Sequence, residues 1–89
     1  MIDYRYNENK TLEELKSYID ATYGQHYAQT GIQVTEFIID AGHGEGFCIG
    51  NVLKYAQRYG KKDGKNRKDL LKVIHYTIML LHIDSLNSK

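Results

Sequence analysis

The chain has 89 residues, with 12 Lys and Arg against 11 Asp and Glu, a formal net charge of +1, and one Cys. A chain of this length suits one small domain with a single core. We therefore do not expect a deep active-site cavity within one chain, and we do expect several copies to assemble. The single cysteine excludes a framework of intrachain disulfides, and 42% hydrophobic residues are typical of a folded protein rather than a disordered one.

The N-terminal half of the chain predicts two helices. Thr11 followed by Glu14 resembles a capping box, which predicts a helix over residues 12–22 that ends before Gly24. The segment 32–41 is β-branched enough to suit a strand, but we expect a helix because its apolar residues share one helical stripe. That stripe consists of Val34, Phe37, Ile38 and Ala41.

The C-terminal half predicts two longer helices. Alternate glycines at positions 42, 44 and 46 indicate a turn before a helix over 45–59, and Gly60 is the expected residue after its end. Asn66 with Asp69 resembles the start of a final helix over 70–86, which is apolar nearly all round. We therefore expect an all-α bundle of about four helices in one domain (1–89, with an N-terminal segment 1–25 and a core 26–86) that forms homo-oligomers.

Charge is unevenly distributed along the chain. Residues 1–53 carry three basic and eight acidic side chains, residues 54–72 carry eight and two, and residues 73–89 carry one of each. Such local clustering predicts a bounded anion site rather than a nucleic-acid track. The charged N-terminus lacks a secretory signal, and the uncharged stretch 73–83 is shorter than the roughly 20 residues of a membrane span. We expect a cytoplasmic protein without membrane contact.

A polar stripe runs along the third predicted helix. At 100° per residue, Asn51, Lys54 and Arg58 fall within about 60°, with Phe47 in their midst. The opposite arc is apolar and is expected to be buried: Cys48, Ile49, Val52, Leu53, Tyr55, Ala56 and Tyr59. An ordinary solvated face is the alternative interpretation of the polar stripe, and cations near a helix C-terminus are also favoured by the macrodipole.

The final predicted helix carries a matching stripe. Asp69, Lys72 and Tyr76 are spaced i, i+3 and i+7, so Asp69 can orient Arg58 or Lys54 while Tyr76 meets a ligand. Two facing stripes of cations and aromatic rings predict a site for a phosphate and a ring.

Several segments of the chain carry a family resemblance. They are His26-Tyr27, Gly46-Phe47-Cys48-Ile49-Gly50-Asn51-Val52-Leu53-Lys54-Tyr55, Arg58, Gly60-Lys61-Lys62, Lys68-Asp69-Leu70, Lys72 and Tyr76. Together they resemble a bacteriophage domain family once catalogued as being of unknown function, which includes the nucleotide kinase of the T-odd coliphages. The resemblance covers about residues 26–86 and implies a phage protein that handles nucleotides in the infected host cell. The kinase's long Cys- and His-rich N-terminal extension has no counterpart in residues 1–25.

Motifs for catalysis are weak by comparison. The run 60–66 is one residue short of a phosphate loop and lacks the hydroxyl that holds magnesium. His75 and His82 are seven residues apart, about 10 Å along a helix, and cannot share a metal unaided, so no metal site is predicted.

The leading hypothesis is therefore a small protein that binds or sequesters a mono- or cyclic nucleotide, such as a signal of host anti-phage defence, without a cofactor. The expected phosphate-binding residues are Asn51, Lys54, Arg58, Lys61, Lys62 and Lys72. The expected base-stacking or orienting residues are His26, Tyr27, Phe47, Tyr55, Asp69 and Tyr76. The alternatives are a nucleoside-monophosphate kinase that uses Mg²⁺ and ATP, and an adaptor that contacts nucleic acid or host protein through residues 54–72.

Overall fold

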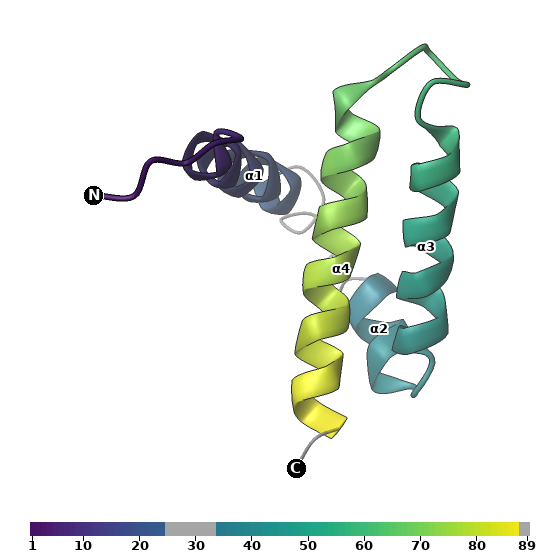
Figure 1. Ribbon diagram of the computed structural model, residues 1–89. Coiled ribbons are helices and arrows are strands. Elements are labelled where there is room, and N and C mark those ends of the chain that lie inside the picture. The colour runs from purple at the N-terminus through teal and green to yellow at the C-terminus, as the bar shows by residue number, and fades with distance from the viewer. Residues whose placement is uncertain (25–33, 88–89) are drawn as a thin grey trace. The chain divides into compact units, whose positions relative to one another are not determined.

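Four helices make up the fold of the computed structural model, which describes residues 1–24 and 34–87. They are α1 (Glu8–Thr22), α2 (Val34–Asp40), α3 (Gly44–Arg58) and α4 (Arg67–Asn87) (Figure 1). No strand occurs in these two ranges, so the all-α prediction is confirmed, including the helix expected for the second segment. The chain divides into two compact units, Met1–Gly31 and Ile32–Lys89.

In the first unit, α1 begins earlier than the sequence predicted. Asn7 adopts a left-handed conformation (φ 58°), the Tyr6 N–H donates to Glu8 Oε1 at 2.8 Å, and the helix starts at Glu8. The Thr11 N–H already donates to the Asn7 carbonyl at 2.9 Å, so Thr11 lies inside the helix. The predicted capping box was therefore wrong, because the local turn around Glu8 begins the helix instead.

The second unit is built on an antiparallel pair of helices. α3 and α4 lie side by side and are joined by a short turn (Figure 1). Gly60, at φ 86°, follows the end of α3 and its N–H donates to the Gly64 carbonyl at 3.0 Å. Asn66 Oδ1 accepts the Lys68 N–H at 3.0 Å, which caps the first turn of α4. Both predicted signals, Gly60 and Asn66, are confirmed.

The short helix α2 packs against the start of α3, where a glycine permits the close approach. A Cβ atom at Gly44 would lie 2.8 Å from Ile39 Cγ1 and 2.9 Å from Ile83 Cδ1, too close for a side chain. The apolar stripe that predicted this helix is not its packed face, since Val34 and Phe37 are 74% and 69% exposed. Ile39, outside that stripe, makes the contact.

The core of the second unit is narrow. Cys48 is completely buried, as expected, and Leu71 and Ile83 are nearly so. The wide apolar arc predicted on α3 is only partly buried, because Ile49 and Leu53 remain 45% and 64% exposed. None of the described helices is both long enough and apolar enough to span a membrane.

Candidate functional site

Cations from both long helices gather around the ring of Tyr55. Lys54 Nζ lies 5.0 Å, Arg58 Cζ 5.8 Å and Lys72 Nζ 5.4 Å from the Tyr55 ring centroid. These distances lie within the range of cation–π attraction. Lys54 and Arg58 come from α3, whereas Lys72 comes from α4, so the packing of the two helices brings the cluster together.

The Tyr55 ring at the centre of this cluster belongs to a group of three aromatic rings. The Tyr55 and Tyr76 rings are nearly parallel (10°) with centroids 6.1 Å apart, and Phe47 meets Tyr76 edge-on at 6.0 Å. These rings are half-buried, which fixes the orientation of the phenol rings. We call the whole set the cationic-aromatic face: Phe47, Lys54, Tyr55, Arg58, Asp69, Lys72 and Tyr76.

The expected contact between Asp69 and Arg58 is present. Arg58 Nε lies 3.7 Å from Asp69 Oδ1, and the Asp69 side chain is only 4% exposed against 27% for Arg58. Neither Arg58 Nε nor Asp69 Oδ2 has a hydrogen-bond partner within the described ranges. Asp69 therefore holds the guanidinium by charge rather than by a short hydrogen bond, and it is a positioning residue at this face.

The other predicted phosphate-binding residues lie outside this cluster. Asn51 donates its Nδ2 to the Phe47 carbonyl of its own helix at 2.9 Å. Lys61 Nζ lies 3.4 Å from Gln57 Oε1, and Lys62 is exposed in the turn after α3. His26 and Tyr27 fall outside the described residues.

Two buried titratable groups, Cys48 and His75, lie on the two helices that carry the cationic-aromatic face. Burial, and secondarily the positive charge of Lys72, lowers the pKa of His75 below its ordinary value. Burial raises the pKa of the Cys48 thiol, which keeps it protonated and unreactive. Across residues 1–24 and 34–87, no three His, Cys, Asp or Glu side chains lie close enough together to hold a metal ion.

The match to known proteins begins in α1 and covers most of the second unit. Residues 21–77 match the DUF3310 family, which is described as a protein of unknown function. The chain belongs to this family. The resemblance to a family of unknown function is thereby confirmed, while the family description assigns no activity. No curated protein matches the chain, and no solved structure does.

The geometry is suited to a ligand that combines negative charge with a planar ring. Ammonium and guanidinium groups bind phosphate oxygens, and the tyrosine rings offer stacking surface beside them. Helical spacing alone put Tyr55 on the buried arc and did not show that it is the centre of the cluster. The signal was its place next to Lys54 and three residues before Arg58, on a helix that faces Lys72.

Proposed function

We propose that this protein binds a nucleotide through the cationic-aromatic face. The observation that supports this most directly is the convergence of Lys54, Arg58 and Lys72 within 5.0 to 5.8 Å of the Tyr55 ring centroid. Like charges held together repel one another, and a bound anion removes that repulsion. Phosphate is the anion that such a set of ammonium and guanidinium donors fits best.

Each cation has its own role in the proposed complex. The Lys54 side chain is exposed and Lys72 is half-buried, so one ammonium reaches a phosphate from solvent and the other from within the helix pair. Arg58 turns its Nε toward Asp69, which leaves the terminal nitrogens of the guanidinium to donate to the ligand. The base of the nucleotide stacks on the tyrosine rings.

Binding and sequestration, rather than turnover, is the activity we favour. Sequestration requires only complementary charge and shape, whereas phosphoryl transfer requires carboxylates placed to hold magnesium. Asp69, the carboxylate of this face, is buried beside Arg58 and is engaged as a counter-charge. In this proposal, the protein is of phage origin and acts as a homo-oligomer in the cytoplasm of the infected cell. There it binds a mono- or cyclic nucleotide, such as a host defence signal.

A nucleoside-monophosphate kinase is the second candidate, and the sequence resemblance to the coliphage enzyme favours it. ATP and Mg²⁺ are cofactors only under this alternative. The run Gly60–Asn66 lies in the turn between α3 and α4 and lacks the serine or threonine of a phosphate loop.

A single set of measurements separates these functions. The protein is titrated calorimetrically with a panel of mono- and cyclic nucleotides, and then incubated with each nucleotide, ATP and Mg²⁺ before heat denaturation and chromatography. We expect one nucleotide to bind and to be released unchanged. A phosphorylated product that depends on magnesium would instead establish the kinase, and no binding by any nucleotide would refute both.

Variants test the site itself. Lys54→Ala combined with Lys72→Ala should weaken binding at least tenfold, about 1.4 kcal/mol, because two of the three cations are lost. Lys10→Ala combined with Lys16→Ala, at two exposed lysines of α1 in the first unit, is the control for the same change in net charge. Equal affinities of the double variant and the control would show that the cationic-aromatic face is only a solvated surface.

A further inference from the structure

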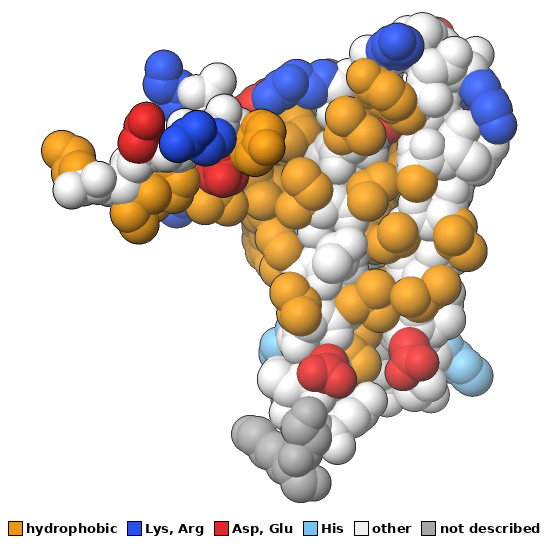
Figure 2. All heavy atoms as spheres, viewed as in Figure 1, with side chains coloured by type: hydrophobic (Ala, Val, Ile, Leu, Met, Phe, Trp, Pro, Cys, Tyr) orange, Lys and Arg blue, Asp and Glu red, His pale blue; other side chains and the backbone are white. Residues whose placement is uncertain are grey.

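The α3–α4 pair has a second, apolar face. Ile49 and Arg58 are nine residues apart on α3, as are Lys72 and Leu81 on α4, and nine residues separate side chains by about 180° around a helix. The residues turned away from the cations form what we call the apolar face: Ile49, Leu53 and Ala56 of α3, and Leu70, Ile74, Thr77 and Leu81 of α4. Figure 2 shows hydrophobic side chains gathered along both helices on this side.

The spacing of these residues is that of a helix-packing seam. On α3 they recur at i, i+4 and i+7, and on α4 at i, i+4, i+7 and i+11, which is the repeat by which one helix packs against another. Leu53 and Leu81 are nevertheless 64% and 65% exposed. Two parallel seams exposed on adjacent helices form a contiguous patch, and such patches mark interaction surfaces.

Thr77, the polar residue at the middle of the seam on α4, is compatible with burial. Its hydroxyl donates to the Val73 carbonyl of the same helix at 2.8 Å. The hydroxyl proton therefore needs no water, and a partner can cover this position without leaving a donor unsatisfied.

The apolar face has opposite charges at its two ends. Glu45 and Asp84 lie where α3 begins and α4 ends, whereas Arg67 lies at the other end, beside the turn. Figure 2 shows the same division, with acidic side chains below the hydrophobic ones and basic side chains above them on the helix pair.

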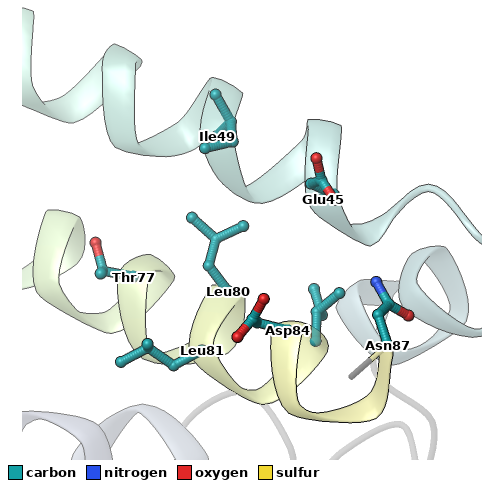
Figure 3. Close-up of a pocket in the computed structure, with 8 residues that line it drawn as sticks. Glu45, Ile49, Thr77, Leu80, Leu81, Asp84 and Asn87 are labelled. Atoms are coloured by element: carbon teal, nitrogen blue, oxygen red, sulfur yellow. The ribbon is translucent and has the colours of Figure 1, made fainter. Parts of the chain in front are cut away.

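A hollow of about 340 Å³ opens at the acidic end of this face. Ile49 and Glu45 of α3 and Leu81 and Asp84 of α4 are among its lining residues (Figure 3). It thus combines an apolar wall with two carboxylates, a combination that suits a long side chain with an apolar stem and a cationic end.

We propose that two copies of this chain pair through the apolar face, with their helices antiparallel. A two-fold axis perpendicular to the helices places the acidic end of each copy over the basic end of the other, and Arg67 of the second copy over Asp84 of the first. A parallel arrangement would place like charges together. Because this face lies opposite the cations, both cationic-aromatic faces of the dimer point outward. The inference is independent of the proposed nucleotide.

The expected dimer is moderate in strength. One face of a helix pair of 15 and 21 residues buries an area near the lower limit of about 1,000 Å² for a specific interface, so we expect dissociation in the micromolar range. The free energy should come mainly from the large aliphatic side chains at its centre, Leu53 and Leu81.

Sedimentation equilibrium across the micromolar range tests the pairing. The full chain should approach twice its mass of 10.3 kDa as concentration rises. Leu53→Glu and Leu81→Glu should each weaken association at least tenfold, with unchanged helix content because both side chains are exposed in the single chain. Leu12→Glu on α1, where Leu12 is 63% exposed, is the matched control and should leave association intact.

Charge reversal tests the antiparallel orientation. Asp84→Lys and Arg67→Glu should each weaken association several-fold, and the two together should restore it, because each pair across the interface is then reversed. Both changes also agree with the helix macrodipole, so neither should unfold α4. Four results would each overturn the proposal. The chain could stay monomeric at every concentration, or neither leucine variant could weaken the assembly. Leu12→Glu could weaken association as much as the leucine variants do, or the double charge reversal could fail to restore association.

Discussion

The two sides of the α3–α4 pair differ in how their side chains are held. On the cationic-aromatic face, side chains are fixed by one another, as in the stack of Tyr55 on Tyr76 and the pairing of Arg58 with Asp69. On the apolar face, Leu53 and Leu81 touch little and remain mostly exposed. One side is therefore organised within the single chain, while the other has the composition of a core without being buried.

The narrow core between the two sides explains why they can differ. Among residues 34–87, a narrow strip that includes Cys48 and Ile83 is buried, so many of the remaining positions on each helix can serve separate contacts. Leu53 and Lys54, adjacent in sequence, belong to different faces.

The largest expected effect comes from removing the counter-charge of a buried carboxylate. Arg58→Ala should lower the free energy of unfolding by about 2 to 3 kcal/mol, because Asp69 stays buried without its partner and Arg58 is only partly exposed. Arg58→Ala combined with Asp69→Ala should be less unstable than the sum of the single changes. Urea denaturation of the four proteins measures this coupling, and strict additivity would show that the pair contributes nothing.

A smaller effect is expected at Gly44, the buried glycine at the start of α3. Gly44→Ala should cost about 1 to 3 kcal/mol, because its Cβ would clash with Ile39 and Ile83. Gly46→Ala is the matched control on the same helix, since nothing lies within 4 Å of its Cβ, and it should gain about 0.5 to 1 kcal/mol. Thermal melts of both variants compare them directly, and equal melting temperatures would contradict the close packing of α2 on α3.

The free energy of unfolding should depend on pH through His75, whose pKa is affected by the positive charge of Lys72. Because burial and Lys72 hold the pKa of His75 below 6.5, the unfolded chain binds protons more readily than the folded one. The contribution of His75 to stability is complete above pH 6.5 and is lost as the pH falls toward the lowered pKa. Denaturation at a series of pH values should show this loss in the native sequence, a smaller loss in Lys72→Gln, and no change from native in Lys10→Gln. Identical curves for Lys72→Gln and the native chain would exclude the influence of Lys72.

The smallest effects on stability are expected from two neighbouring variants that test whether the two faces act independently. Leu53→Glu and Lys54→Ala should each change the free energy of unfolding by less than about 0.5 kcal/mol, since both side chains are exposed. Leu53→Glu should weaken pairing and keep nucleotide affinity, whereas Lys54→Ala should weaken nucleotide binding and keep pairing. If either variant lost both properties, the faces would not be independent.

Much of the fold was predictable because its signals are local. Gly60 and Asn66 mark the turn between α3 and α4 through their own backbone and side-chain hydrogen bonds, which neighbouring residues determine. The start of α1 could not be predicted, because it depends on the left-handed conformation of Asn7, which an asparagine adopts only in some contexts.

The site was predictable in part for a similar reason. The spacing of Lys54 with Arg58 and of Asp69 with Lys72 follows from helical periodicity, and the packing of α3 on α4 then brings the two sets together. The exposure of Ile49 and Leu53 was not predictable, because an apolar residue on a helix has the same pattern whether it faces the chain's own core or a separate molecule.

Cys48 provides a built-in reporter of how the helix pair opens. It is the chain's one cysteine and is completely enclosed, so a thiol reagent can reach it only while the surrounding side chains separate. The rate of labelling therefore reports how often and for how long the surrounding side chains are apart, without any engineered probe. A ligand on one side or a second copy on the other would each slow labelling. The first effect would depend on the ligand concentration and the second on the protein concentration.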